Sequence, residues 1–180
     1  MNHLDIRVTL PVDLEAVLKV ETAAFGKTEE ANLVKDLLND SSAEPRLSLM
    51  ASLEDQAVGH ILFTRANLEP DQNLKTYILA PLAVIPSCQK VGIGGKLIET
   101  GMQILKGWEV DWVFVLGHES YYPRHGFSPA MKQGFEPPFP IPEQFTAAWM
   151  GQTLILNSAV SYRSKVIPAK TLNKPCYWGQ

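Results

Sequence analysis

The residues best suited to chemistry form a glycine-rich turn at positions 89–96. Gly92, Gly94 and Gly95 stand between an apolar run and a segment with helical spacing. Glycine lets the backbone approach a ligand closely, and the first turn of a helix presents unpaired N–H groups at its positive end. The pattern predicts a pyrophosphate cradle, although a glycine turn without a ligand remains an alternative. The flanking side-chain donors are Gln89, Lys90 and Lys96.

Two familiar phosphate-binding motifs do not fit this turn. The dinucleotide fingerprint fails because its third glycine would fall on Leu97. The P-loop fails as well, since Lys90 stands at its first glycine and Leu97 replaces the hydroxyl that would bind Mg²⁺. The turn therefore predicts an anion site without fixing the ligand.

Two further residues are of types that can accept or donate a proton. Glu21 lies on the first predicted helix and His118 follows a buried strand. Each has an ordinary alternative, because Glu21 could lie on a solvated helix face and His118 could be a hydrogen-bonded loop or core histidine. His60 lies in a predicted strand, where a structural role is favoured. Cys88 adjoins the glycine turn, but no base pairs with it in the sequence, so nucleophilic catalysis is disfavoured.

The elements that position these residues follow from hydrophobic periodicity. The run 77–85 is apolar on both faces, which predicts a central strand, and Pro81 within it predicts a bulge or a local break in pairing. This strand, the helix after it and the next strand predict a parallel βαβ unit. The order as a whole predicts an α/β (α+β) fold with a mixed sheet. The expected elements are strand 3–9, helix 13–26, helix 28–39, strands 47–53 and 57–66, strand 77–85, helix 93–108 with Trp108 buried, strand 112–116, a short helical piece 119–124 and strand 146–156.

Composition limits the class of protein. The chain has 180 residues, 46% of them hydrophobic, and a net charge of -3, which suits one globular domain at 1–160 with a C-terminal extension at 161–180 packed on it. The absence of a basic run argues against nucleic acid as a partner, and the absence of a long apolar run argues against a membrane. Two cysteines without metal-ligand spacing predict no metal site. A cytoplasmic location with reduced thiols is expected, and a homodimer is compatible with these observations.

Two motifs together resemble those of a known family. The segment 89–94, Gln-Lys-Val-Gly-Ile-Gly, is similar to the Gln/Arg-x-x-Gly-x-Gly/Ala signature of GCN5-related N-acetyltransferases (GNAT). The segment 121–127, Tyr-Tyr-Pro-Arg-His-Gly-Phe, resembles the second signature of that family, a tyrosine four residues before a Gly-Phe pair. The resemblance covers roughly residues 3–160 and is nearest to poorly characterised bacterial acetyltransferases.

The resemblance implies a fold and a co-substrate. A mixed central sheet, covered by helices on both faces, would splay open around acetyl-CoA, which is the co-substrate and requires no metal. The pantetheine arm would pair with the backbone of Leu82, Ala83 and Val84. The phosphates would lie on the turn. The residues implied there are Gln89, Lys90, Val91, Gly92, Ile93, Gly94, Gly95 and Lys96.

The resemblance also implies a reaction in which an acceptor amine, on a small molecule or a protein, attacks the thioester directly in a ternary complex. Tyr122 would contact the co-substrate and protonate the departing sulfur. Many family members place a glutamate on the strand before the glycine turn, but 77–85 contains no carboxylate. The base is therefore left open between Glu21, His118 and a water relay.

Three rivals to this function remain open at the level of sequence. The enzyme could use a longer acyl-CoA or an oxygen acceptor, as an O-acyltransferase. The chain could also be an acyl-CoA-binding regulatory module with weak or no turnover. The identity of the acceptor does not follow from the sequence.

Overall fold

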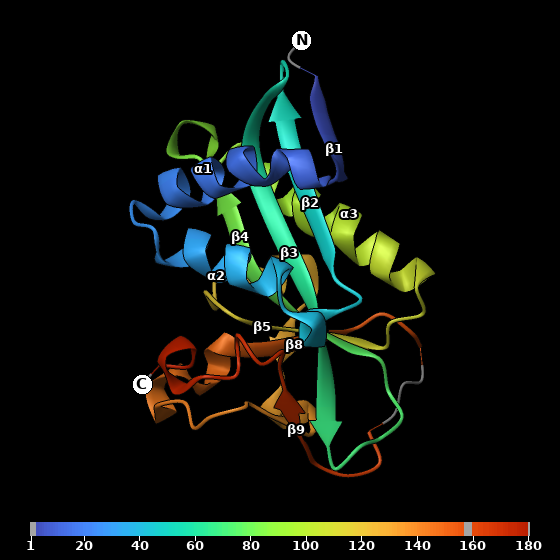
Figure 1. The fold of residues 1–180 in the computed structure, drawn as a ribbon. Helices are drawn as coiled ribbons and strands as arrows, with labels where there is room; N and C mark the ends of the chain where they lie inside the picture. Colours follow the sequence, from blue (N-terminus) through green and yellow to red (C-terminus); the bar gives the residue numbers. More distant parts are fainter. Residues whose placement is uncertain (1–2, 157–159, 180) are drawn as a thin grey trace.

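A mixed β-sheet runs through the chain in a computed structural model that describes residues 3–156 and 160–179 (Figure 1). The strands follow the order β1-β2-β3-β4-β5-β8-β6, with β4 and β5 parallel and the other neighbours on this path antiparallel. The strands are β1 (Leu4–Val8), β2 (Leu47–Leu53), β3 (Gln56–Glu69), β4 (Thr76–Val84), β5 (Trp112–Leu116), β6 (Ser128–Pro129), β7 (Phe135–Glu136), β8 (Trp149–Thr153) and β9 (Ser164–Ile167).

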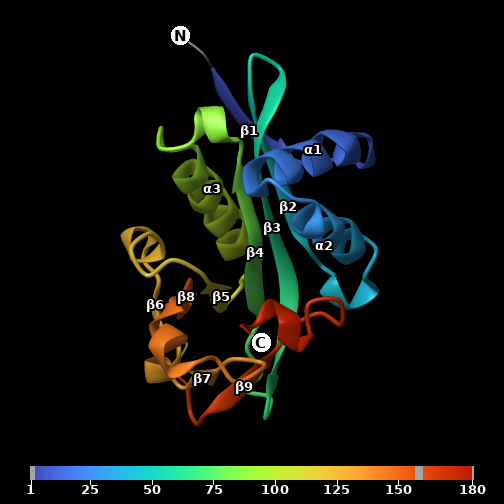
Figure 2. The same cartoon turned by 90° about the vertical axis from the view of Figure 1, so that its left-hand side faces the viewer.

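Helices cover both faces of the sheet, as the sequence predicts. The α-helices are α1 (Leu14–Phe25), α2 (Glu29–Leu38) and α3 (Ile93–Gly107). In Figure 2, α3 lies on one side of β2, β3 and β4, and α1 and α2 lie on the other. Because side chains alternate along a strand, β3 contributes Ile61 and Phe63 to the core under α3 and Leu62 to the core under α1 and α2.

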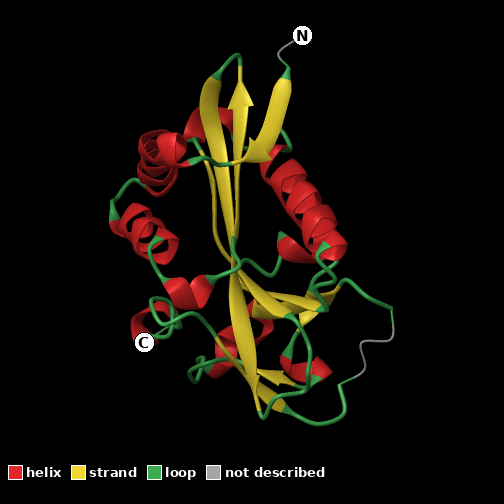
Figure 3. Ribbon diagram, turned by 45° about the vertical axis from the view of Figure 1, so that its right-hand side comes forward, coloured by secondary structure: helices red, strands yellow, loops and turns green. Residues whose placement is uncertain are grey.

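The lower half of β3 extends the sheet beyond the predicted hairpin. Residues 67–69 of β3 pair with β9, which also pairs with β7 (Figure 3). The segment after 160 carries too little periodicity to reveal β9, and its place depends on strands far away in sequence. Trp178 then packs edge-on against Trp149, with ring centroids 5.6 Å apart. The predicted domain boundary at 160 adjoins undescribed residues and stays a prediction.

Two local predictions are wrong. The strand expected over 146–156 is confined to β8, because residues 143–148 form a 3₁₀ helix. Trp108 follows the last residue of α3 and is 38% exposed, so it is not part of the buried stripe of that helix. Both errors lie at element ends, where local periodicity gives little information.

The described residues lack two features, a membrane-spanning helix and a cluster of metal ligands. Within 3–156 and 160–179, no helix combines the length and apolar character that crossing a membrane requires. In the same part of the chain, no group of three or more His, Cys, Asp and Glu side chains is arranged to hold a metal ion.

Candidate functional site

The sheet opens between β4 and β5. The two strands pair only over Thr76–Ile78 and Trp112–Phe114 within the described residues. Beyond this point β5 continues beside β8, while residues 79–84 of β4 keep β3 as their neighbour. One edge of β4 therefore offers backbone groups that an extended ligand could pair with.

The bulge predicted at Pro81 is confirmed. Ile61 of β3 pairs with Leu82 and Phe63 pairs with Leu79, so two residues of β4 oppose a single residue of β3. A bulge bends its strand and increases the local twist. It lies where β4 has already separated from β5, and it helps to turn the 82–84 segment away from β5.

The glycine turn follows this free edge and opens α3. Gly92 has φ 93° and caps the helix, and Ile93 is its first residue. Lys90 also adopts a positive φ, 61°, which is uncommon for a residue with a side chain. The turn therefore holds the left-handed backbone that exposes the N-terminal amides of α3, as expected for an anion cradle.

Gly94 and Gly95 also lie against side chains of the second motif, which their spacing in the sequence does not reveal. A Cβ atom at Gly94 would lie 2.6 Å from the Tyr121 hydroxyl, and one at Gly95 would lie 2.9 Å from Cε1 of His125. The second motif therefore packs directly on the first turn of α3. The two motifs, separated in sequence by a helix and a strand, form one structural unit.

A cavity of about 690 Å³ lies beside this unit. Lys96, Lys106 and Arg124 give it positive charge, and Lys96 Nζ also pairs with Glu99 Oε2 at 3.0 Å. A cavity with cations beside a helix N-terminus fits a phosphorylated ligand. It is lined by Gly92, Gly95, Lys96, Ile98, Glu99, Met102, Gln103, Lys106, Arg124, His125, Gln152, Thr153 and Leu154.

The other predicted contacts of the co-substrate lie around the same edge. The Gln89 side-chain amide donates to the Val84 carbonyl at 2.9 Å, which ties the turn to the end of β4. Ala83 is buried, whereas Leu82 and Val84 are partly exposed and Val91 is exposed. The structure thus gathers the strand edge, the turn and the start of α3, while Gln89 already has a partner.

The two tyrosines of the second motif occupy different environments. Tyr122 is buried, with its ring against Gly117 and edge-on to Phe127 at 5.7 Å. Burial raises the pKa of the Tyr122 phenol, and Tyr121 adds to the rise. Tyr121 is only partly buried: its ring packs edge-on against Tyr122 at 5.2 Å, and its hydroxyl faces Gly94 in the turn.

The candidate base Glu21 belongs to a buried chain of polar groups. Its Oε1 lies 2.5 Å from His60 Nδ1, and His60 Nε2 lies 2.9 Å from Ser48 Oγ. Glu21 and His60 are fully buried and Ser48 is 6% exposed. Burial raises the pKa of the Glu21 carboxyl, although the hydrogen bond from His60 opposes this rise and Glu30 adds to it. The alternative of a solvated helix face for Glu21 is therefore wrong.

His118, the other candidate base, lies apart from this chain. It sits in the loop after β5, where its backbone carbonyl accepts hydrogen bonds from the amides of Tyr121 and Tyr122. The sequence predicts no role for Ser48, and it favours a structural role for His60. Their alternation in β2 and β3 places both on the face covered by α1, but the partner in α1 is 39 residues away from His60.

These features define an acyltransferase of the splayed-sheet type, and the comparisons agree. The family model described as "Acetyltransferase (GNAT) family" matches residues 14–127. The chain therefore belongs to the acetyltransferase (GNAT) family, and it is an acyltransferase with the N-acetyltransferase activity of that family.

Individual relatives match over most of their length. The uncharacterized N-acetyltransferase YjhQ of Escherichia coli K12 is 50% identical over 156 residues, 86% of each chain. The Escherichia coli YhbS structure in complex with CoA has a TM-score of 0.87 at 24% identity and covers 97% of this chain and 94% of its own. A Brucella melitensis acetyltransferase of the GNAT family in complex with acetyl-CoA has a TM-score of 0.76 at 26% identity, covering 96% and 99%.

Proposed function

We propose that this protein transfers an acetyl group from acetyl-CoA to an amine, by direct attack within a ternary complex. The observation that carries the proposal is the separation of β4 from β5 directly beside the glycine turn of α3. This arrangement offers a strand edge for an amide-bearing arm and helix amides for phosphates in one continuous site. The CoA complexes of two structures with this fold support the assignment.

The binding residues have distinct tasks in this proposal. The backbone of Leu82–Val84 pairs with the amides of the pantetheine arm, as a ligand strand pairs with a sheet edge. The backbone amides around Gly92 hold the pyrophosphate. Arg124 and Lys96, which line the neighbouring cavity, add charge toward the phosphates. When bound, acetyl-CoA supplies an activated thioester, and holding both reactants together lowers the barrier by roughly 7 kcal/mol or more.

Two side chains manage protons in the proposal. An alkylammonium acceptor has a pKa near 10 and must lose a proton before it can attack. Glu21 is the proposed base, because its Oε1 is held by His60 while its Oε2 has no partner among the described residues and can accept a proton. Tyr122 is the proposed donor to the departing sulfur. Its raised pKa makes complete proton transfer to a thiolate unfavourable, so its main contribution is a hydrogen bond as charge develops on sulfur.

A thiol-release assay with acetyl-CoA and a panel of primary amines tests the proposal. Turnover with at least one amine is expected, with product confirmed by mass spectrometry. Glu21→Gln should lose roughly 100-fold in kcat while its Kd for acetyl-CoA stays near wild type. Binding of acetyl-CoA without turnover of any amine or alcohol would support a regulatory module instead, and turnover restricted to alcohols would identify an O-acyltransferase.

A further inference from the structure

The Glu21–His60–Ser48 chain links two different regions of the α1 and α2 face. At one end, Glu21 Oε2 is buried without a hydrogen-bond partner among the described residues, and the same holds for Glu30 Oε2. His60 pairs across the strands with Ala83, the central residue of the proposed pantetheine segment. This end of the chain therefore lies under the part of β4 that has parted from β5.

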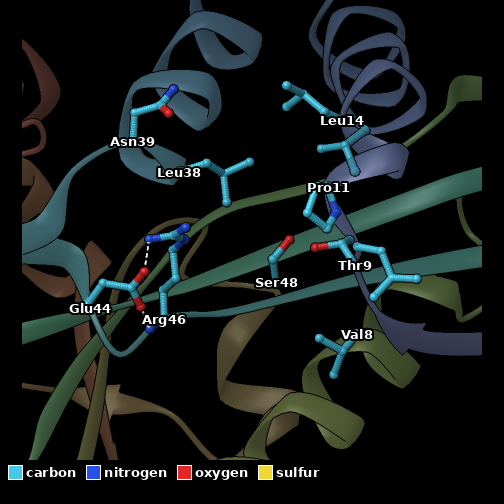
Figure 4. Close-up of a pocket in the computed structure, with 11 residues that line it drawn as sticks. Val8, Thr9, Pro11, Leu14, Leu38, Asn39, Glu44, Arg46 and Ser48 are labelled. Atoms are coloured by element: carbon cyan, nitrogen blue, oxygen red, sulfur yellow. Dashed lines mark hydrogen bonds and ion pairs between the residues drawn. The ribbon is translucent and has the colours of Figure 1, made fainter.

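The other end of the chain meets a separate cavity. Ser48 lines a cavity of about 440 Å³ between the start of α1 and the end of α2 (Figure 4). α1 crosses the sheet, so Leu14 and Val17 line this cavity, while Glu21 lies at the opposite end of the Glu21–His60–Ser48 hydrogen-bonded chain. Figure 4 shows Arg46 paired with Glu44 beside the Ser48 hydroxyl. Ser48 therefore borders a cavity that lies away from the glycine turn.

We propose that Glu21, His60 and Ser48 form a proton relay that carries the acceptor's proton from the acceptor site to this cavity. The proposal rests on the proposed function, because it assumes that the acceptor's ammonium meets Glu21. His60 and Ser48 are positioning residues in this scheme, since they act on the acceptor through Glu21.

Two proton arrangements satisfy both hydrogen bonds, and their exchange is the relay. In one arrangement the Glu21 carboxyl donates to His60 Nδ1, and the Nε2–H donates to Ser48 Oγ. In the other arrangement His60 Nδ1–H donates to Glu21, and the Ser48 hydroxyl donates to Nε2. The ammonium proton passes to Glu21 Oε2 as the Oε1 proton moves to Nδ1, the Nε2 proton moves to Ser48 Oγ, and the Ser48 proton leaves to water in the cavity.

The atoms balance in this step, because one proton enters the chain and one leaves it. The imidazole remains neutral throughout, and the buried carboxyl never carries an isolated charge, which would be costly in this environment. The ionisable groups that face Glu21 are His60 from β3 and Glu30 from α2. Lys27 offsets the Glu30 charge through an ion pair of 3.5 Å.

If the Glu21–His60–Ser48 hydrogen bonds only stabilise the fold, the rate at which the His60 ring N–H exchanges with solvent should respond differently to mutation of Ser48. The experiment follows the exchange of the His60 ring N–H with D₂O by NMR, in the protein without acceptor. If Ser48 carries the proton, Ser48→Ala should slow this exchange about tenfold, and Ser48→Thr should restore it. If the hydrogen bonds only hold the fold, Ser48→Ala loosens the site, and the exchange becomes faster or stays unchanged, which would overturn the proposal.

Thr64→Val is the matched control. Thr64 lies on β3, is fully buried and has a hydroxyl without a partner among the described residues, so it resembles Ser48 in burial but stands outside the chain. In Thr64→Val, the exchange rate of the His60 ring N–H should equal that of wild type. Slowed exchange in Thr64→Val as well would assign the effect to packing and overturn the relay.

Kinetics supply the second readout. With primary alkylamines, Ser48→Ala and His60→Gln should each lower kcat about tenfold, leave the KM for acetyl-CoA unchanged and recover at alkaline pH. The loss should shrink with arylamines, which are neutral at pH 7. Absence of turnover with every amine would count against the proposed function alone, because the exchange measurement still decides the relay.

Discussion

At the scale of single residues, the neighbouring tyrosines of the second motif show how one position can change a role. Tyr122 packs in the core below Gly117, whereas Tyr121 places its hydroxyl on the first turn of α3. The family resemblance implies a proton donor at Tyr122, which stands four residues before Gly126 in the sequence. Burial raises the pKa of this phenol, so in the proposed reaction Tyr122 would contribute a hydrogen bond more than a transferred proton.

Tyr122→Phe removes the hydroxyl and leaves the ring packing in place. We expect kcat to fall on the order of 10- to 100-fold, at the low end for a lost acid because a thiolate is already a fair leaving group. The KM for acetyl-CoA should change much less. Steady-state kinetics against a confirmed acceptor measure both constants.

Tyr121→Phe is the control for that measurement. Its kcat should stay near wild type, since its hydroxyl contacts Gly94 and not the core around Tyr122. Equal losses of kcat in the two variants, or a loss confined to Tyr121→Phe, would show that the assignment of the donor to Tyr122 is wrong. A fully active Tyr122→Phe would make Tyr122 a structural residue.

At the scale of elements, the start of α3 and the second motif behave as one unit. Gly94→Ala should weaken acetyl-CoA binding several-fold, because the added methyl group would meet the Tyr121 hydroxyl at 2.6 Å and shift the turn that is proposed to hold the phosphates. Calorimetric titration of the folded variant with acetyl-CoA measures the change in Kd.

A double variant separates this clash from a direct effect on the phosphates. Adding Tyr121→Phe to Gly94→Ala removes the clashing oxygen, so affinity should return toward that of Tyr121→Phe alone. If the double variant binds as weakly as Gly94→Ala, the methyl group obstructs the ligand itself. Unchanged affinity in both would remove this glycine from the binding site.

The elements also show which parts of the fold and of the candidate site can be predicted from the sequence. Apolar runs and the glycine turn predict the βαβ unit, and Pro81 predicts the bulge, because both depend on local patterns. The pairing of β9 with β3 and the hydrogen bond between Glu21 and His60 depend on contacts between distant segments. Nothing in the spacing of Ser48, His60 and Glu21 reveals that one buried chain joins them.

At the scale of the whole molecule, the C-terminal segment is tied to the turn after α2, where the Lys170 amide donates to Ser42 Oγ and the Thr171 amide donates to Asp40. Asp40 accepts hydrogen bonds from the Ser42 amide and hydroxyl and from the Thr171 amide. Burial raises the pKa of Asp40, but these hydrogen bonds outweigh it and lower the pKa to about 2. The ionised carboxylate is therefore favoured by folding.

A pH dependence of stability follows from this shift. Since the folded pKa lies below the unfolded value, Asp40 contributes its stability in full above about pH 4, and the contribution is lost as the pH falls toward 2. Asp40→Asn should lower the free energy of unfolding by about 1–2 kcal/mol at pH 7 and by less at pH 3. Urea denaturation at both pH values measures this, and an equal loss at the two would contradict it.

Ligand binding should also stabilise the whole molecule. A ligand that binds only the folded state adds RT ln(1 + [L]/Kd), about 2.7 kcal/mol at a hundredfold excess over Kd. Acetyl-CoA should therefore raise the melting temperature, and NAD and ATP should raise it much less. A larger shift with NAD or ATP would point to a nucleotide-binding protein of another kind.

The short contact between β4 and β5 has a mechanical consequence. The sheet has two parts, β1 to β4 and β5 with β8 and β6, which pair with each other over Thr76–Ile78 and Trp112–Phe114. Helix α3 leads from one part to the other. An extended ligand bound between the two parts of the sheet would continue the pairing along β4 and hold the two parts together. The backbone amides of residues 79, 80 and 82–84 should then exchange more slowly with deuterium when acetyl-CoA is bound.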